Sequence, residues 1–172
     1  MTRTCAIIGC SPMCFPWGFD EEDEGCAALK LILINQISKL RREGCTRFAL
    51  SMDCGVGLYA VEILHGLKES DKEIETICYV PYEEQATKWT PVLRDRYFNA
   101  LAVCTEVVNA AYEKTVGCEF KAHLEAIKEA DTLIAIYDPE DPRCEWEAAA
   151  TAVAEMLNKQ ILTLDPKAIR LQ

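Results

Sequence analysis

The sequence predicts a three-layer α/β domain, in which a mostly parallel sheet of about six strands carries helices on both faces. Short apolar runs alternate with amphipathic segments almost without interruption, as expected for strands joined by crossover helices. The 172 residues suffice for one domain with a sizeable core. No linker, repeat or low-complexity segment divides them. We therefore expect a single Rossmann-like domain over residues 1–172.

The first apolar run, at 4–8, is short and ends at Gly9, as a buried strand would. After a loop rich in proline and aromatic residues, a helix is expected over 24–43, with Asp23 as its cap and Gly44 as its stop. One stripe at three- and four-residue spacing forms its apolar face. Leu31 and Ile34 fall outside that stripe, so this helix is also expected to pack against a partner subunit.

The middle of the chain repeats the alternation twice. A strand is expected at 48–50, and an apolar stripe from Val56 to Leu67 predicts the helix that follows the next loop. The next strand is expected at 74–80 and is ended by Pro81. Thr90 and Pro91 then have the pattern of an N-cap and a first-turn proline, which predicts the third helix.

The last part of the chain holds the strand with the most pronounced apolar run, at 131–137. A short strand is expected before it at 106–108, followed by a helix at 119–130. An alanine-rich helix at 145–157 and a strand at 160–164 complete six strands and about five helices.

The composition restricts the partners and the location. Twenty-eight acidic residues against 18 basic ones give a net charge of −10, which argues against nucleic-acid binding and against docking on an anionic membrane. No secretory leader precedes the first strand, and the apolar run at 31–34 is far too short to span a bilayer. We therefore expect a cytoplasmic protein whose ten cysteines are reduced.

Ligands of an open parallel sheet bind beyond the carboxyl ends of its strands. Of the segments there, Ser51-Met52-Asp53-Cys54-Gly55-Val56-Gly57 is the strongest candidate for a ligand-binding loop. Its two glycines allow close approach of the backbone, and the amides that open a helix attract an anion such as phosphate. The spacing matches neither common phosphate-loop pattern, and tight strand–helix turns also use glycine without any ligand.

Four further residues are candidates, each with an ordinary structural alternative. Asp138 follows a strand and Glu62 lies within a helix, so either carboxylate could hold a ribose hydroxyl or act as an acid or base, although solvated carboxylates are common. Lys121, in the first turn of a helix, could meet a phosphate. Trp89 could stack on a base or simply pack in the core or a lid.

The histidines and cysteines give weaker indications. His65 and His123 both lie within helices and lack partners at metal-ligand spacing, so no zinc site is expected. Four cysteines fall near strand carboxyl ends or helix starts, where thiols can have a lowered pKa. One hypothesis is that they gather around a redox or metal function. These four are Cys10, Cys54, Cys118 and Cys144.

Several short motifs together resemble one known family. They are Phe15-Pro16-Trp17-Gly18-Phe19-Asp20-Glu21-Glu22-Asp23, Ser51-Met52 with Gly55-Val56 and Ala60-Val61-Glu62, Pro81 with Gln85 and Trp89, Arg94-Asp95-Arg96-Tyr97, and the strand ending at Asp138. In combination the chain resembles the YpsA-like family of the SLOG group, whose relatives include DprA and the LOG-type phosphoribohydrolases.

The resemblance implies a Rossmann-like fold, frequent homodimers, and a nucleotide or nucleotide-derived ligand, of which ADP-ribose is one example. It implies that the loop from Ser51 to Gly57 holds the ligand, that Glu62 lies behind it, and that Asp138 closes the other side. The candidate ligand-binding residues are Gly9, Cys10, Ser51, Met52, Gly55, Val56, Gly57, Trp89, Lys121 and Asp138.

The chain also departs from the family pattern where charged ligands are usually held. Cys10-Ser11 replaces a basic pair after Gly9, Gly57 replaces an acidic residue, Lys121-Ala122 replaces an Arg-Asn pair, and residues 141–144 replace a glycine turn. Three hypotheses follow: a small-molecule binding or sensor protein, an N-glycosidic-bond hydrolase with Glu62 as its carboxylate, and an interaction protein that has lost the ligand.

Overall fold

The computed structural model describes residues 2–169 as one α/β domain with a six-stranded, all-parallel sheet. The strand order is β4-β3-β2-β1-β5-β6. The strands are β1 (Arg3–Gly9), β2 (Cys45–Ser51), β3 (Glu75–Val80), β4 (Glu106–Asn109), β5 (Thr132–Ile136) and β6 (Gln160–Leu164). The predicted fold class is therefore confirmed, and the sheet is parallel throughout.

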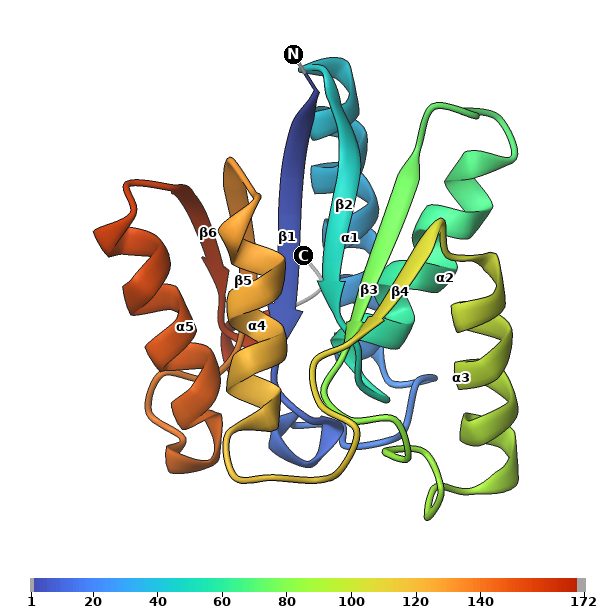
Figure 1. Ribbon diagram of the computed structural model, residues 1–172, viewed down its shortest axis with the longest axis vertical. Coiled ribbons are helices and arrows are strands. Elements are labelled where there is room, and N and C mark those ends of the chain that lie inside the picture. The colour runs from blue at the N-terminus through green and yellow to red at the C-terminus, as the bar shows by residue number, and fades with distance from the viewer. Residues whose placement is uncertain (1, 170–172) are drawn as a thin grey trace.

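Five α-helices cover the two faces of the sheet (Figure 1). They are α1 (Glu24–Arg42), α2 (Val56–Lys68), α3 (Pro91–Val103), α4 (Cys118–Lys128) and α5 (Glu145–Met156). The first three lie on one face, and α4 and α5 lie on the other. Three single-turn 3₁₀ helices, η1 (Pro12–Cys14), η2 (Pro142–Cys144) and η3 (Pro166–Ala168), lie in the loops. Strand order reverses between β1 and β5, so the carboxyl ends of these strands open onto the crevice where such sheets bind ligands.

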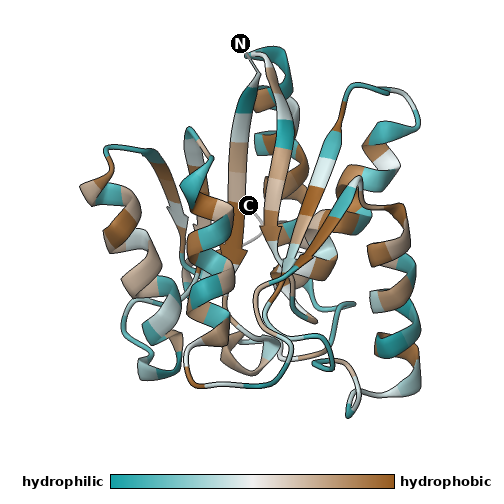
Figure 2. Ribbon diagram, viewed as in Figure 1, coloured by the Kyte–Doolittle hydropathy of each residue, from teal (hydrophilic) through white to brown (hydrophobic). Residues whose placement is uncertain are grey.

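The core follows the predicted apolar pattern. Hydrophobic residues concentrate on the central strands, while hydrophobic and hydrophilic residues alternate along the helices (Figure 2). In α1 the predicted stripe is buried, and Asp23 caps the helix through a 2.7 Å bond from the amide of Gly25. Leu31 lies outside the stripe and is 53% exposed, whereas Ile34 is half-buried.

The weakest predicted strand is present as the short edge strand β4, most of which is exposed. The strand expected at 48–50 is longer than predicted, because it begins at Cys45 and ends at Ser51. Within residues 2–169, no helix has the length and apolar character needed to cross a bilayer.

Candidate functional site

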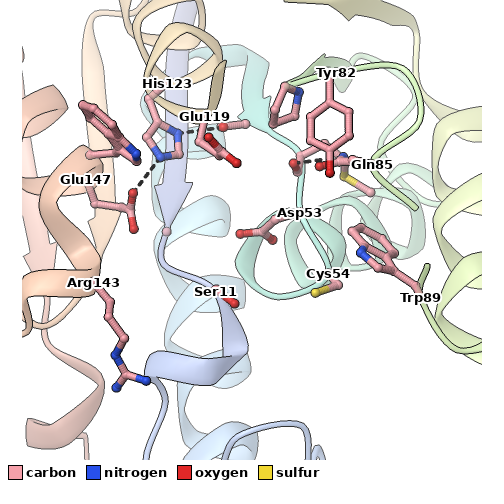
Figure 3. Close-up of a pocket in the computed structure, with 15 residues that line it drawn as sticks. Ser11, Asp53, Cys54, Tyr82, Gln85, Trp89, Glu119, His123, Arg143 and Glu147 are labelled. Atoms are coloured by element: carbon pink, nitrogen blue, oxygen red, sulfur yellow. Dashed lines mark hydrogen bonds and ion pairs between the residues drawn. The ribbon is translucent and has the colours of Figure 1, made fainter. Parts of the chain in front are cut away.

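A pocket of about 350 Å³ lies at the carboxyl edge of the sheet (Figure 3). It is bounded by the loops that follow β1, β2 and β3 and by the N-terminal turns of α4 and α5, which lie on the same face of the sheet. This volume is within the range of small-molecule sites. The lining residues are Gly9, Ser11, Ser51, Met52, Asp53, Cys54, Pro81, Tyr82, Gln85, Trp89, Glu119, His123, Arg143, Trp146 and Glu147.

The loop between β2 and α2 is folded around the carboxylate of Asp53. The oxygen Oδ1 of Asp53 accepts hydrogen bonds from the amides of Gly55 at 2.8 Å and Gly57 at 2.9 Å. These amides open α2, and the sequence predicted that they would hold an anionic ligand. In this structure the acceptor at the helix N-terminus is the protein's own side chain, which comes from two residues before the N-cap position at Gly55.

Close packing accounts for the glycines around this loop. A Cβ atom on Gly57 would lie 2.6 Å from the carbonyl oxygen of Ser51, and one on Gly9 would lie 2.3 Å from the side chain of Val56. Gly9 lines the pocket, whereas Gly55, Val56 and Gly57 do not. The close approach that these glycines permit is therefore between the end of β1, the end of β2 and the start of α2.

Burial makes the carboxyl group of Asp53 an unusually weak acid. Removal from water raises the pKa of its carboxyl group to about 7, although the two amide hydrogen bonds act in the opposite direction. The carboxylate of Glu147 adds to the increase. The pocket therefore contains a carboxyl group that can hold or release a proton near neutral pH.

His123 connects two sides of the pocket. Its Nδ1 atom lies 2.7 Å from Oγ of Ser51 at the end of β2, and its Nε2 atom lies 2.9 Å from Oε2 of Glu147 on α5. All three side chains are buried. A carboxylate only accepts hydrogen bonds, so Nε2 is the nitrogen that donates to Glu147. In that tautomer Nδ1 accepts a hydrogen bond from the hydroxyl group of Ser51, and the dashed lines at His123 in Figure 3 mark both contacts.

Aromatic and amide side chains form the opposite wall of the pocket. Trp89 is half-buried and packs edge-on against Tyr97, with ring centroids 5.1 Å apart. Gln85 is fixed by bonds from Nε2 to the carbonyl of Met52 at 3.2 Å and to the Tyr97 hydroxyl at 3.3 Å. Tyr82 lies beside Gln85 (Figure 3). This wall presents ring surfaces held in place by buried contacts.

The charges of the lining side chains are mostly negative. Asp53, Glu119 and Glu147 supply carboxyl groups, and Arg143 is the only arginine or lysine that lines the pocket within the described residues. The guanidinium of Arg143 is already engaged, because it pairs with Asp141 at 2.8 Å and donates to the carbonyl of Met13 at 3.1 Å. The pocket is thus poorly equipped to bind a phosphate group.

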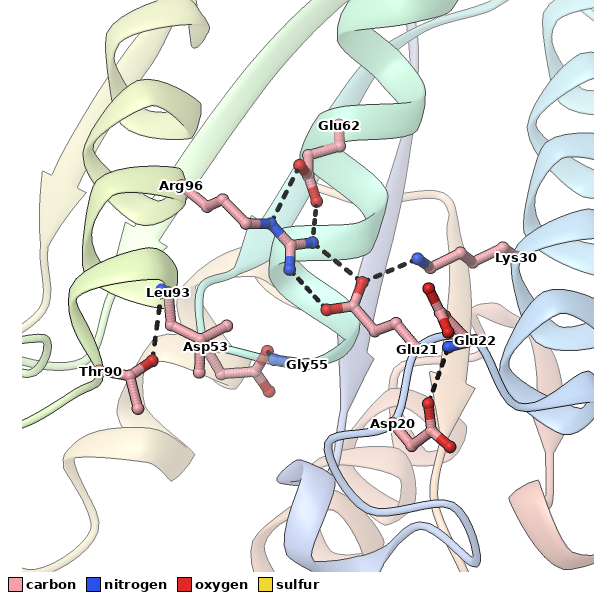
Figure 4. A network of polar contacts seen from close by, with 10 residues as sticks. All are labelled: Asp20, Glu21, Glu22, Lys30, Asp53, Gly55, Glu62, Thr90, Leu93 and Arg96. Carbon is pink, nitrogen blue, oxygen red and sulfur yellow. Dashed lines mark hydrogen bonds and ion pairs between the residues drawn. The ribbon is translucent and has the colours of Figure 1, made fainter.

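The three charged residues that the sequence predicted for the site, Glu62, Lys121 and Asp138, lie outside the pocket. Glu62 projects from α2 and pairs with Arg96 at 2.6 Å; Arg96 also binds Glu21 (Figure 4). Lys121 donates to the carbonyl of Ala110 at 2.5 Å. Asp138 is buried after β5 and is paired with Lys167 at 2.5 Å, and this partner lowers the pKa of its carboxyl group.

Of the ten predicted ligand-binding residues, the pocket brings together Gly9, Ser51, Met52 and Trp89. Sequence reasoning did not predict that Asp53 binds the amides at the start of α2. It also did not recognise His123, Glu119 or Glu147 as parts of a site. One signal was present, because Glu119 and His123 are four residues apart and therefore share one face of α4. The partners of His123 are 72 and 24 residues away in the chain, and no local pattern indicates them.

The structure gathers three cysteines, but they are not the set that the sequence indicated. The Sγ atoms of Cys10, Cys14 and Cys144 all lie within 4.8 Å of one another. Cys14 was not among the four cysteines expected to gather, and neither Cys54 nor Cys118 belongs to this group. All ten cysteines are free thiols.

Comparison with known families supplies the classification. The family model YpsA, described as the YspA SLOG family, matches residues 5–169, which is nearly the whole chain. The chain belongs to the YpsA family. The resemblance inferred from the short motifs is therefore confirmed.

The curated relatives in the YpsA family are distant. The chain is 29% identical over 142 residues to the UPF0398 protein BLi02355/BL05236 of Bacillus licheniformis, an alignment that covers 80% of this chain and 76% of the relative. It is 26% identical over 127 residues to the UPF0398 protein BH1768 of Halalkalibacterium halodurans, covering 72% and 67%. A UPF0398 protein of Bacillus cereus is 25% identical over 143 residues, covering 81% and 77%. The names of these relatives state no ligand or activity.

Proposed function

We propose that the strand-end pocket binds a nucleotide-derived small molecule, and that the ligand is a nucleoside-like compound without a phosphate group. The observation that carries this proposal is the position of Asp53, whose carboxylate takes the amides of Gly55 and Gly57 at the start of α2. A phosphate at that position would have to displace a side chain of the protein that is already bound through two hydrogen bonds.

The other charges support the same ligand class. Glu119 and Glu147 add carboxyl groups to the lining, and the one arginine, Arg143, is neutralised by Asp141. Carboxylates accept hydrogen bonds from ribose hydroxyl groups and from amino groups, and they repel phosphates. A neutral or cationic ligand rich in hydrogen-bond donors complements this lining.

The shape and the aromatic wall support a planar ring. Tyr82, Trp89 and Trp146 line the pocket, and Trp89 is held by its contact with Tyr97. A fixed aromatic side chain offers a stacking surface to a heterocycle at low entropic cost. The volume of about 350 Å³ suits a ligand of nucleoside size better than a dinucleotide.

The test is a thermal-unfolding screen that compares matched nucleosides, 5′-monophosphates, NAD and ADP-ribose. A ligand that binds only the folded protein raises Tm, and the rise grows with the ratio of the ligand concentration to Kd. We expect nucleosides to raise Tm more than their own 5′-phosphates at equal concentration. A larger shift with the phosphates would contradict the proposal, and no shift with any compound would favour a protein that has lost the ligand.

A pair of variants locates the binding. Trp89→Leu removes a ring from the pocket wall and is expected to abolish the nucleoside-induced shift in Tm. Tyr112→Leu is the matched control, since Tyr112 is 80% exposed and does not line the pocket. Equal effects of the two substitutions would argue against binding at this site.

A second candidate function is hydrolysis of the N-glycosidic bond of the bound nucleoside. The observation that favours it is the Asp53 carboxyl group, whose pKa of about 7 suits a general acid. Asp53 would protonate the departing base as the bond to C1′ breaks, and water would form the new C1′–O bond and return its second proton to the Asp53 carboxylate. This role falls to Asp53 instead of Glu62, which lies outside the pocket. Chromatography of nucleosides incubated with the protein tests it: free base and ribose are expected, and Asp53→Asn is expected to stop their release.

The homodimer and the cytoplasmic location stay predictions. The exposed Leu31 on α1 is the surface residue that the sequence assigned to a subunit contact. Sedimentation of the wild-type chain and of Leu31→Lys tests this assignment, because a dimer held through α1 would dissociate in the variant.

A further inference from the structure

A cluster of three thiols lies beside the pocket and takes no part in the proposed binding. Cys10 follows β1, Cys14 ends η1, and Cys144 ends η2 and caps α5. The pairing of Gly9 with Ile136 in the sheet brings these loops together, and the amide of Cys10 donates to the carbonyl of Ile136 at 3.0 Å. The three Sγ atoms therefore meet from separate segments, within 4.8 Å of one another.

The geometry is close to that of a metal site. Three sulfur atoms around one ion, with metal–sulfur bonds of about 2.3 Å, are separated by about 4 Å. Sulfur atoms within 4.8 Å reach this arrangement by small side-chain rotations, without movement of the sheet. The short hydrogen-bonded turns at Ser11–Cys14 and Asp141–Cys144 hold the backbone of two ligands in position.

The set of ligands selects the ion. Within residues 2–169, no histidine or carboxylate joins the three sulfur atoms at the same spacing. Structural zinc sites require four ligands, whereas thiolates alone favour soft ions. Because Cys10 and Cys144 are 0% and 1% exposed and Cys14 is 7% exposed, water has little access as a fourth ligand. Monovalent copper is a soft ion that three sulfur ligands satisfy.

We propose that Cys10, Cys14 and Cys144 form a three-coordinate site for a soft monovalent cation of the Cu(I) class. The site is separate from the nucleoside pocket, since none of the three cysteines lines that pocket. Failure of nucleoside binding therefore leaves this proposal intact, and failure of copper binding leaves the proposed function intact.

The test is an anaerobic titration of the reduced full-length chain with Cu(I), in competition with a chelator of known affinity. We expect one tightly bound Cu(I) per chain and an X-ray absorption spectrum with three sulfur neighbours. Absence of binding, a two-sulfur centre, or selective binding of Zn²⁺ with four ligands would overturn the proposal. These measurements use the wild-type protein and do not depend on the folding of any variant.

Matched serine variants locate the ion. Cys14→Ser is the first choice, because Cys14 is the least buried of the three and its replacement disturbs the core least. We expect its affinity for Cu(I) to fall by more than the roughly 10- to 100-fold that loss of an outer-shell partner costs. Cys104→Ser is the control, since the sulfur atoms of Cys78 and Cys104 lie 2.9 Å apart and form the competing thiol pair. Loss of copper from Cys104→Ser with retention by Cys14→Ser would assign the ion to that pair instead.

Discussion

The imidazole of His123 lies 2.7 Å from the hydroxyl oxygen of Ser51, and this contact joins α4 to the end of β2. The other ring nitrogen holds Glu147 of α5. Two helices on one face of the sheet are thus fixed to the strand whose end forms the candidate pocket. The hydroxyl of Ser51, the imidazole and the Glu147 carboxylate thus stand in the order of a nucleophile, a base and an acid group. The same contacts also satisfy three buried polar groups.

Replacement of His123 by alanine is expected to destabilise the fold strongly. It would leave Glu147 buried without its partner and Ser51 without its acceptor, a type of loss that costs about 3 kcal/mol. Urea unfolding measures the change in free energy. His65→Ala is the control, since the other histidine is exposed on α2 and should change stability by less than about 0.5 kcal/mol. Similar values for the two variants would mean that the buried contacts contribute little.

Asp53 is expected to make stability depend on pH. Its pKa in the folded protein, about 7, exceeds the ordinary value of 3.8, so the folded state binds a proton that the unfolded state releases. The resulting stabilisation is complete below about pH 4 and is lost as the pH rises through about 7. Asp53→Asn cannot ionise, so the variant should lose less stability between these pH values.

Thermal unfolding of wild type and Asp53→Asn across this range measures the difference. Asp95→Asn on α3 is the control, because Asp95 is exposed and replacing it removes the same charge. The explanation fails if the slopes of wild type and Asp53→Asn coincide.

Two glycines of α2 should respond in opposite ways to alanine. The added Cβ at Gly57 would lie 2.6 Å from a backbone oxygen of Ser51, so Gly57→Ala must displace backbone and is expected to cost about 2 kcal/mol or more. Gly66 has no atom within 4 Å of the same position, so Gly66→Ala is expected to stabilise the helix by about 0.5–1 kcal/mol. The denaturant midpoints of both variants measure these changes. A Gly57→Ala variant as stable as the wild type would show that the packing around Gly57 is loose.

Glu62 is expected to act in stability and not in ligand binding. Together with Glu21 it holds Arg96, so the ion pairs join α2, α3 and the loop before α1 (Figure 4). The pairs are partly exposed, and Glu62→Gln should cost less than about 1 kcal/mol. The nucleoside-induced rise in Tm should be unchanged in this variant. If Glu62→Gln abolishes that rise while the protein stays folded, the assignment of Glu62 to the ligand site would be restored.

The sequence predicted the fold well because the relevant signals are local. The stripe on α1 and the apolar run of β5 each reveal a buried face within a few residues, and alternation of such segments dictates a parallel sheet. The ends of β2 were less certain, because Cys45 and Ser51 join the strand through pairing with β1 and β3, which local composition does not record.

The site was predicted only in its location. A glycine-rich turn before α2 looks the same whether its amides bind a ligand or Asp53, so spacing alone could not distinguish the two cases. His123 could not be assigned because its partners come from β2 and α5, and their proximity exists only in the folded chain. The members of the cysteine cluster were only partly predicted for the same reason. Position near a strand end indicated Cys10 and Cys144 but not Cys14.

On the proposed function, Asp53 has a consequence for the compounds that compete for this pocket. Where a protein fills its own anion position, the abundant nucleoside triphosphates gain no advantage there from their phosphates. Such a protein does not need high affinity to ignore them. It can respond to a scarce dephosphorylated compound against a large excess of phosphorylated analogues, because a single side chain has removed the feature that they share.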